Sequence, residues 1–470
     1  MSIMLVAAAT VLVILCKPQG KSTLPRPNNW GETRAFSAAN DPKELLKVFR
    51  ASYTAHQLYV LRSDVAKPLT ALDHAFDNVR SEAELRSAML QLFAATKDRF
   101  GEMIDASKYD TIMALRAKSR IGIGVEFAFD EEVEKPTLRL TLKEGEIEPK
   151  HGLEEKDIVL RIDGQDVESI PDFDKKSDGP VGKMVTEYAN LGLLGSKVKL
   201  TVLRDSAEVE VELTRHIVEK AEPFQVHNMM DPSIRQGVPE GQIIDFATLA
   251  NDDAPKKFAE ALTTMTKNGI KGVIVDVSSV NGGDPEVAMR IAAMLMDQGV
   301  IGHRVEVTES GDVQMLTWEA KDGGVILRRK GPMAVSADGK LAKASTAETV
   351  TQLSGWQSGL WKGDVIVVTG AETRGAPELI AAAMKTQAKR GPIVGERTAG
   401  KGMAQSHFNV GDDTIIGITT GYYLAPNGTS IQDNGVVPTV QSSQRQPAYI
   451  LAQYLMAQRF KLVPMPKYPE

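Results

Sequence analysis

Residue types that carry metal, nucleotide and thiol chemistry occur in this sequence without the spacing that such chemistry requires. No HExxH pair, GxxxxGK[ST] phosphate loop or strand-GxGxxG-helix turn is present, and Gly122 and Gly124 open a strand rather than a helix. The seven histidines, among them His151 and His407, stand without acidic neighbours at an informative spacing, so each is expected to be a surface or structural residue. The single cysteine, Cys16, excludes a disulfide framework and a thiolate zinc site. We therefore expect no metal and no other cofactor.

Composition and charge narrow the class of protein further. The chain has 470 residues, of which 42% are hydrophobic and 25% charged, and these are values of an ordinary globular protein with about three domains. The 55 Lys and Arg residues stand against 61 Asp and Glu residues, which gives a net charge of -6. No basic field is present to hold a nucleic-acid backbone, so nucleic acid is not an expected partner.

The N-terminal residues resemble a targeting segment. Residues 3–15 read IMLVAAATVLVIL, followed by a polar, Pro-bearing stretch. As a helix this run would span about 20 Å, short of the ~30 Å hydrocarbon core but suited to the apolar region of a signal peptide. We expect an exported, periplasmic or membrane-tethered protein with a signal-like or anchor segment and linker at 1–29. A start-site artefact and a buried helix are the alternatives, since no Lys or Arg precedes the run.

The rest of the chain divides into regions of different periodicity. Apolar residues recur at steps of three and four in residues 30–118, which predicts a helical N-terminal region. Alternating segments bounded by turns predict a small, mostly β domain at 119–215. Strand-like and helix-like blocks then alternate through 216–442, which predicts a layered α/β domain with a largely parallel sheet. Short strands and a Gly-rich loop at about 304–363 indicate an insertion, and 443–470 form a C-terminal tail.

Five sequence segments, in a fixed order after the helical region, closely resemble the carboxyl-terminal processing peptidases, also called tail-specific proteases. They are IGIGVEF, HGLEEKDIVLRIDGQDV, GIKGVIVDVSSVNGG, GERTAGKGMAQ and TTGYYLAPNGTSIQDNGVVPTV. The resemblance covers about residues 41–440. It implies an α/β fold, with a crotonase-like layered peptidase core and an inserted PDZ domain. It also implies a serine nucleophile, a lysine base, and polypeptide C-termini or unfolded proteins as partners.

The resemblance places the family's lysine base at Lys401, within Gly400-Lys401-Gly402, and the glutamine that orients it at Gln405. A lysine acts as a general base only if desolvation or a nearby cation lowers its pKa from about 10.4 toward neutrality. Flanking glycines let the backbone approach closely enough to bury such a side chain. An exposed lysine in a glycine turn is the alternative.

The serine nucleophile of the family is missing from this sequence. Aligning Glu378 with the family glutamate puts Gly375 at the nucleophile position, whereas counting back from Lys401 puts Ala376 there. Thr373 is the only hydroxyl left in this turn. A threonine can attack when a base lies within reach, but a shift of two residues misplaces the side chain, and 1 Å can cost about a hundredfold in rate. The alternative role of Thr373 is a helix-start cap.

Two further sites follow from the resemblance. Gly282 and Gly283 stand where the family has an oxyanion-hole glycine, while the family arginine and asparagine before it have become Ser278 and Ser279. Backbone donors survive such a loss of side chains. The alternative is an ordinary strand-to-helix turn, which would show the same pair of glycines.

In the PDZ segment, four residues match the loop whose amides take a peptide C-terminal carboxylate while the peptide adds a strand. They are Gly122, Ile123, Gly124 and Val125. A glycine-bearing turn in any small β domain is the alternative.

Three functions are compatible with these residues. The first is a pseudopeptidase that binds polypeptide C-termini and has lost its nucleophile. The second is an active endopeptidase that uses Thr373, or a hydroxyl brought from elsewhere such as Ser358 or Ser406, with Lys401. The third is a carrier of a small apolar ligand in the former substrate cleft.

Overall fold

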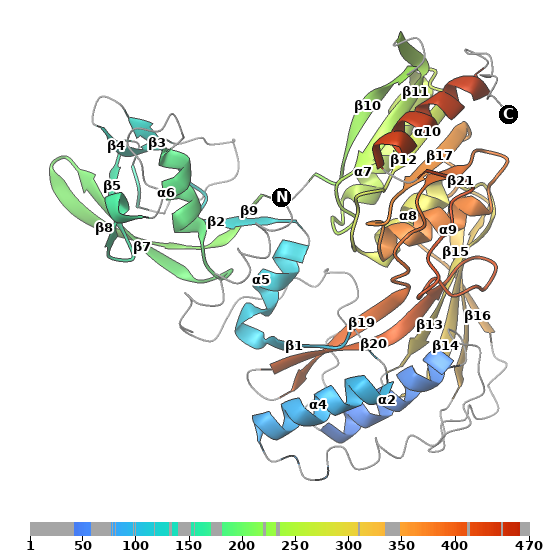
Figure 1. Cartoon of the computed structure of the whole chain (residues 1–470), viewed down its shortest axis with the longest axis horizontal. Helices are drawn as coiled ribbons and strands as arrows, with labels where there is room; N and C mark the ends of the chain where they lie inside the picture. Colours follow the sequence, from blue (N-terminus) through green and yellow to red (C-terminus); the bar gives the residue numbers. More distant parts are fainter. Residues whose placement is uncertain are drawn as a thin grey trace. The chain divides into compact units, whose positions relative to one another are not determined.

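The structure is a computed structural model of the chain, and its residues form two compact units, Asp105–Ala221 and Asn28–Ile104 with Glu222–Glu470 (Figure 1). The residues that it describes are 42–57, 77, 79, 81–96, 98, 100–116, 118–130, 134–139, 152–154, 156–170, 181–219, 222–231, 236–308, 311–333, 348–410, 414–442 and 445–460. The expected targeting segment at 1–29 lies outside these residues, as does His151. None of the helices in the described ranges has the length and hydropathy that a membrane span needs.

A largely parallel sheet forms the upper half of the larger unit in Figure 1. Its strands in spatial order are β10 (Phe224–Asp231), β11 (Gln236–Phe246), β12 (Gly272–Asp276), β17 (Asp364–Thr369), β18 (Ile393–Gly395) and β21 (Val440–Gln441). Strands β11 to β21 are parallel, and β10 pairs with β11 in the antiparallel direction. This sheet confirms the parallel α/β arrangement that the alternating blocks predict.

Both faces of the parallel sheet are covered by helices, which explains the continuous Val and Ile runs of its strands. Helices α7 (Ala254–Lys267), α8 (Pro285–Met294) and α9 (Ala376–Lys385) cover one face, and α10 (Arg445–Arg459) covers the other. Successive residues of β12 alternate between the two cores: Val273 and Val275 face the first group, and Ile274 faces α10. The prediction that residues 443–470 form a C-terminal tail is therefore wrong for α10, because this helix packs on the parallel sheet as part of the core.

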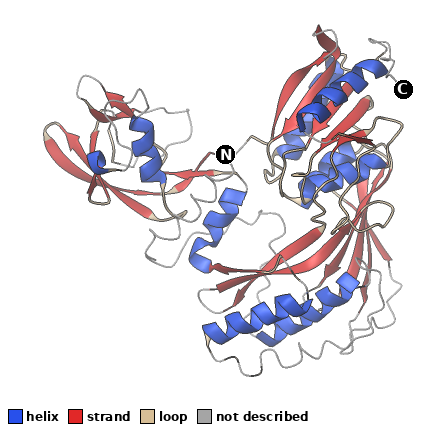
Figure 2. Cartoon of the chain, viewed as in Figure 1, coloured by secondary structure: helices blue, strands red, loops and turns tan. Residues whose placement is uncertain are grey.

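A second, antiparallel sheet packs on the outer side of α8 and α9 (Figure 2). Its strands are β1 (Glu102–Asp105), β13 (Gly299–Val307), β14 (Val313–Lys321), β15 (Gly324–Met333), β16 (Glu348–Gln352), β19 (Met403–Val410) and β20 (Thr414–Leu424). Helices α2 (Pro42–Ala55) and α4 (Glu82–Thr96) cover its other face. The expected insertion at 304–363 is wrong, because β13 to β16 form more than half of this sheet.

The smaller unit is built around a second antiparallel sheet. Its strands are β3 (Glu126–Asp130), β4 (Lys135–Arg139), β5 (Ile158–Ile162), β6 (Gln165–Asp166), β7 (Lys197–Arg204) and β8 (Ala207–Thr214). Strands β2 (Arg120–Gly122) and β9 (His216–Glu219) form a separate two-stranded sheet. Its helices are α5 (Ala106–Arg116), the 3-10 helix η2 (Val167–Ser169) and α6 (Val181–Asn190). In β7, Val198 and Leu200 are buried while Lys197 and Lys199 are exposed, as one-sided burial requires.

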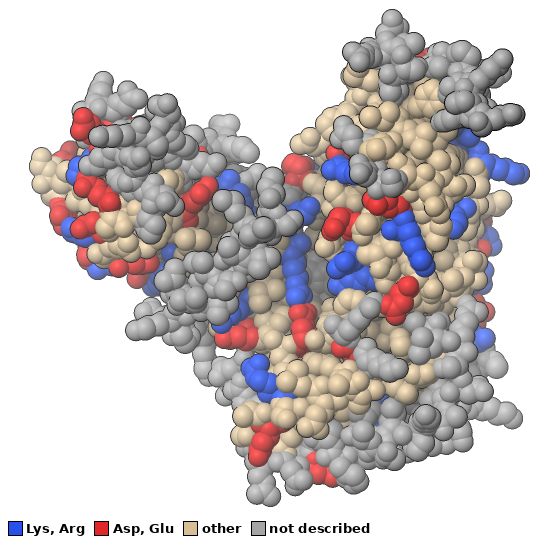
Figure 3. All heavy atoms as spheres, viewed as in Figure 1, with Lys and Arg blue, Asp and Glu red and all other residues tan. Residues whose placement is uncertain are grey.

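The boundary of the helical N-terminal region differs from the expected one. Helix α5 belongs to the smaller unit, and residues 102–105 form strand β1, which pairs with β20. The predicted β domain at 119–215 lies inside the smaller unit. Over the face drawn in Figure 3, Lys and Arg side chains are interspersed with Asp and Glu side chains on both units.

Candidate active site

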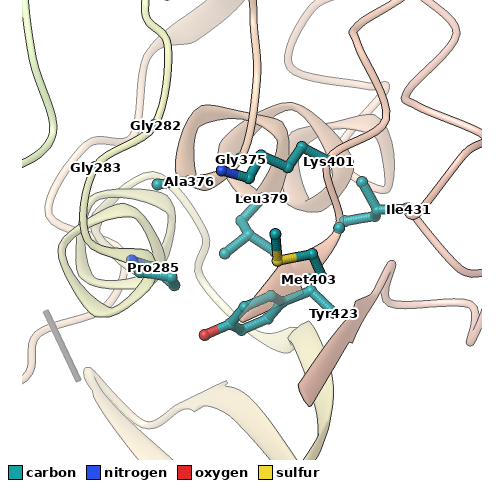
Figure 4. A pocket seen from close by; sticks show the side chains of 11 residues that line it. Gly282, Gly283, Pro285, Gly375, Ala376, Leu379, Lys401, Met403, Tyr423 and Ile431 are labelled. Carbon is teal, nitrogen blue, oxygen red and sulfur yellow. The ribbon is translucent and has the colours of Figure 1, made fainter. Parts of the chain in front are cut away.

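A small pocket lies where the turns before helices α8 and α9 meet the turn that carries Lys401 (Figure 4). Its volume is about 70 Å³, which is room for a few water molecules. The residues that line it are Gly282, Gly283, Pro285, Gly375, Ala376, Leu379, Lys401, Gly402, Met403, Tyr423 and Ile431. The pocket thus brings together the expected base, the expected nucleophile position and the expected oxyanion glycines.

Two neighbouring parallel strands position the glycine turns. Val275 of β12 pairs with Val367 of β17, so both strands end at the same edge of the sheet. Beyond this edge, two backbone hydrogen bonds join the turns: Arg374 N donates to Val280 O at 3.1 Å, and Gly282 N donates to Arg374 O at 2.7 Å. The turns that contain Gly282 and Gly375 therefore lie side by side.

Gly375 ends the second turn in a conformation that residues with side chains rarely adopt. Its φ is 76° and its ψ is -125°, and it is the N-cap residue of α9. A Cβ added there would lie 3.4 Å from the Cα of Gly282, so the space admits a side chain although the backbone disfavours it. Ala376, the alternative nucleophile position, is the buried first residue of α9. In Figure 4 the side chain of Lys401 extends toward the turn of Gly375.

Glu378 holds the turn of Gly375 and the lysine turn together. Its side chain is fully buried, and its carboxylate accepts hydrogen bonds from the backbone nitrogens of Gly375 at 2.9 Å, Gly400 at 2.8 Å and Lys401 at 2.8 Å. The hydroxyl of Thr398 donates a fourth bond. Hydrogen bonds to an ionised acceptor are about twice as strong as neutral ones. Sequence reasoning used Glu378 only to align the turn, although its place three residues into α9 is a helix-capping signal.

The amine of Lys401 lies over an aromatic ring. Its Nζ is 5.4 Å from the centroid of the Phe100 ring, which is within the range of a cation-π contact. Gln405 supports this ring, because its Nε2 donates to the carbonyl oxygen of Phe100 at 2.6 Å. The structure thus joins Gln405 to the lysine through Phe100, which the sequence did not single out.

Thr373 connects two turns through its hydroxyl. The side chain is fully buried, Oγ1 donates to Val277 O at 3.0 Å, and it accepts from Gly370 N at 2.9 Å. Thr373 is not among the residues that line the pocket, and the N-cap of α9 is Gly375. This geometry argues against both expected roles of Thr373, the nucleophile and the helix-start cap.

The two other hydroxyls considered as nucleophiles lie outside the pocket lining. Ser406 is a buried residue of β19 whose Oγ lies 2.7 Å from Oγ1 of Thr420. Ser358 is buried in the segment before β17, and its backbone nitrogen donates to Gly323 O. Neither serine is placed to transfer a proton to Lys401 within the pocket.

The expected oxyanion donors differ in how far they are already used. Gly282 N donates to Arg374 O, and the nitrogen of Gly375 donates to Glu378. Both amides are occupied, because each can donate only one hydrogen. The backbone nitrogen of Gly283, whose φ is 115°, is therefore the remaining candidate oxyanion donor in this turn.

Two titratable residues near the pocket have shifted pKa values. Burial raises the pKa of Tyr423 to about 12, while the neighbouring Arg304 opposes this shift. Burial also raises the pKa of Asp284 to about 6, and the carboxylate of Glu286 adds to this effect. Asp284 is the half-buried N-cap of α8, where it accepts from Glu286 N at 2.7 Å. Because the pKa of Tyr423 is about 12, its phenol stays protonated at neutral pH.

In the smaller unit, the four residues expected to bind peptides form the connection from β2 to β3. Gly122 ends β2, Gly124 has a φ of 75°, and Val125 precedes β3. A groove of about 810 Å³ lies next to this connection, and residues of α5, β2, the start of β3 and α6 line it. Within the described residues of both units, no group of three His, Cys, Asp or Glu side chains could hold a metal ion.

Comparisons with known proteins find similarity to peptidases over much of the chain. The sequence profile of peptidase family S41 matches residues 242–442. The chloroplastic C-terminal processing peptidase of Tetradesmus obliquus is 24% identical over 366 residues, which cover 76% of this chain and 68% of that protein. The carboxyl-terminal-processing protease of Synechocystis sp. is 24% identical over 362 residues, which cover 77% and 71%.

A solved structure, that of a photosystem II D1 C-terminal processing protease, is 20% identical and covers 90% of this chain and 99% of that one, with a TM-score of 0.45. Residues 242–442 thus match a peptidase family S41 domain, and about three quarters of the chain is similar to carboxyl-terminal processing peptidases.

Proposed function

We propose that this protein binds polypeptide C-termini through a PDZ domain and does not hydrolyse peptides. The larger unit, with its two sheets and the helices between them, is proposed as a crotonase-like peptidase core. The smaller unit is proposed as the PDZ domain, since it has a helix, α6, packed beside an edge strand, β3, and a glycine-bearing connection before that strand.

One observation carries the proposal of inactivity. Among the residues that line the pocket beside Lys401, the only hydroxyl belongs to Tyr423. Burial raises the pKa of this phenol to about 12, and Figure 4 shows its oxygen pointing away from Lys401. The expected nucleophile position, Gly375, has no side chain. None of the lining residues thus offers Lys401 an aliphatic hydroxyl, and acyl transfer with a lysine base needs such a nucleophile.

The test of inactivity is a hydrolysis assay on the full chain. Unfolded protein and peptides with apolar C-termini should remain intact by mass spectrometry, and Lys401→Ala should leave this result unchanged. Cleavage that copurifies with the protein and disappears in Lys401→Ala would contradict the proposal.

The test of tail binding compares two forms of one peptide. A fluorescein-labelled octapeptide ending in valine should bind with its C-terminal carboxylate free and bind at least tenfold more weakly as the C-terminal amide, because backbone amides capture the anionic terminus. Equal affinity for the two forms would remove the proposal of tail recognition.

An active endopeptidase is the second candidate, with Thr373 or another hydroxyl as the nucleophile. The family supports it, but the hydrogen bonds that Thr373 makes to Val277 and Gly370 do not. A steady cleavage that Thr373→Val abolishes would establish this function.

The apolar-ligand carrier has less support, since the pocket volume of about 70 Å³ is well below the roughly 300–1,000 Å³ of ligand sites. Export, with a periplasmic or tethered location, remains a proposal that rests on the sequence of residues 1–29 alone.

A further inference from the structure

The groove of the smaller unit lies where an added peptide strand would pair with β3. This strand is at the edge of its sheet, with β4 on one side and helix α6 packed on the other. The connection from β2 to β3 lies next to the groove, whose lining includes Ile121 before the connection and Glu126 after it. A peptide that adds a strand here needs the backbone N–H groups that point away from β4.

Side chains of α6 already accept hydrogen bonds from one N–H group of β3 and from one N–H group in the connection before it. The nitrogen of Ile123 donates to Oδ1 of Asn190 at 2.9 Å. The nitrogen of Phe127 donates to Oγ1 of Thr186 at 2.8 Å. Asn190 and Thr186 lie four residues apart, on one face of the helix, so a single face supplies both acceptors.

Gly122 is what lets the amide of Asn190 reach this position. A Cβ at residue 122 would lie 2.7 Å from Oδ1 and 2.9 Å from Cγ of Asn190, so a side chain there would displace the carboxamide of Asn190. The space that the glycine leaves beside the connection is thus filled by the chain's own carboxamide, whose oxygen accepts the same N–H that a terminal carboxylate would use.

We infer that Asn190, with Thr186, forms a latch that holds the tail-binding groove closed and lowers its affinity for free C-termini; this inference rests on the tail binding proposed above. A peptide carboxylate has to displace Oδ1 of Asn190 from Ile123, and the added strand has to displace Thr186 from Phe127. Release of the Asn190 bond, by a rotamer change or a shift of α6, converts the groove to its binding form.

The test measures the affinity of the full chain for the fluorescein-labelled octapeptide with a free C-terminal valine. Asn190→Ala should raise the affinity about three- to tenfold, the equivalent of one neutral hydrogen bond. Asn190→Asp should lower it about tenfold or more, because a carboxylate accepts from Ile123 more strongly and repels the peptide terminus. Tyr188→Phe is the control, since it removes a hydrogen bond from the same helix to Gln165 and should leave the affinity unchanged.

The outcomes separate the latch from the tail-binding proposal. If neither the unmodified chain nor Asn190→Ala binds the peptide, tail binding itself is wrong. If the unmodified chain binds and Asn190→Ala binds equally or more weakly, tail binding stands and the latch is wrong, with Asn190 then a ligand contact. Hydrogen exchange of the unmodified protein gives a second readout: the amides of Ile123 and Phe127 should be protected without peptide, and fast exchange of both would overturn the latch.

Discussion

The carboxylate of Glu378 accepts the backbone N–H of Lys401 at 2.8 Å. The same carboxylate accepts the N–H of Gly375, the N-cap of α9. The position of the lysine turn is therefore fixed relative to α9, the helix whose first turn lacks the nucleophile. A buried carboxylate held by several N–H donors is a rigid arrangement. The lysine turn therefore keeps its geometry independently of whether residue 375 carries a hydroxyl.

Glu378→Gln should destabilise the larger unit by about 2–4 kcal/mol, because the amide nitrogen of glutamine would face backbone N–H donors that it cannot accept. Urea unfolding measures this change. Glu372→Gln is the matched control, since Glu372 lies exposed in the same turn and should change the free energy of unfolding by less than about 0.5 kcal/mol. Equal effects of the two substitutions would show that Glu378 does not hold the turns together.

Thr373→Val should destabilise the protein by about 1–3 kcal/mol, because it leaves the N–H of Gly370 and the carbonyl of Val277 without their buried partner. The side chains have similar volumes, so packing changes little. Thermal and urea unfolding measure the loss. A variant as stable as the unmodified protein would show that the hydroxyl has no structural role. It would then favour the interpretation that Thr373 is the nucleophile.

The centre of the parallel sheet could be predicted from the sequence because β12 and β17 each carry their own signal. Strands buried on both faces read as unbroken Val and Ile runs, and the turns after β12 and β17 are marked by glycines. The antiparallel sheet could not be predicted in the same way. Strand β13 pairs with β20 more than a hundred residues away, and nothing local in 304–363 indicates this partner.

The contents of the pocket were predictable from motif order, but the contacts of its residues were not. The resemblance brought Lys401, Gly282 and Gly375 to one site, where the structure also places them. The partner of Thr373 is a carbonyl on another strand, and the ring beside Lys401 comes from Phe100. Such contacts depend on tertiary packing, which spacing in a single sequence does not encode.

Asp284 should give the stability a specific pH dependence. Burial raises its pKa to about 6 from an ordinary value of 3.8, so the folded state binds more protons between these values. The stabilising contribution is fully present below about pH 3.8 and is lost as the pH rises through 6. Asp284→Asn keeps an N-cap acceptor but cannot titrate.

The free energy of unfolding of Asp284→Asn, relative to the unmodified protein, should therefore rise by about 1–2 kcal/mol between pH 4 and pH 7, a figure reduced for partial exposure. Urea titrations at both pH values measure the difference. A difference that does not change with pH would mean that Asp284 titrates at its ordinary value.

The last prediction tests whether the rest of the active site still functions. Gly375→Ser should create slow, Lys401-dependent peptidase activity, because a Cβ fits at residue 375 beside Gly282 and the lysine amine extends toward this turn. The φ of 76° should cost the variant about 1 kcal/mol of stability. Ala376→Ser is the control for the alternative register. Residue 376 also lines the pocket, so cleavage by Ala376→Ser and not by Gly375→Ser would assign the nucleophile position to residue 376.

A base contributes about 100- to 10,000-fold to such a rate, so Gly375→Ser combined with Lys401→Ala should return to background. The assay follows cleavage of an unfolded protein by mass spectrometry, with circular dichroism to verify folding. Folded serine variants at both positions without Lys401-dependent cleavage would show that Lys401 and the glycine turns are scaffold rather than a dormant catalytic site.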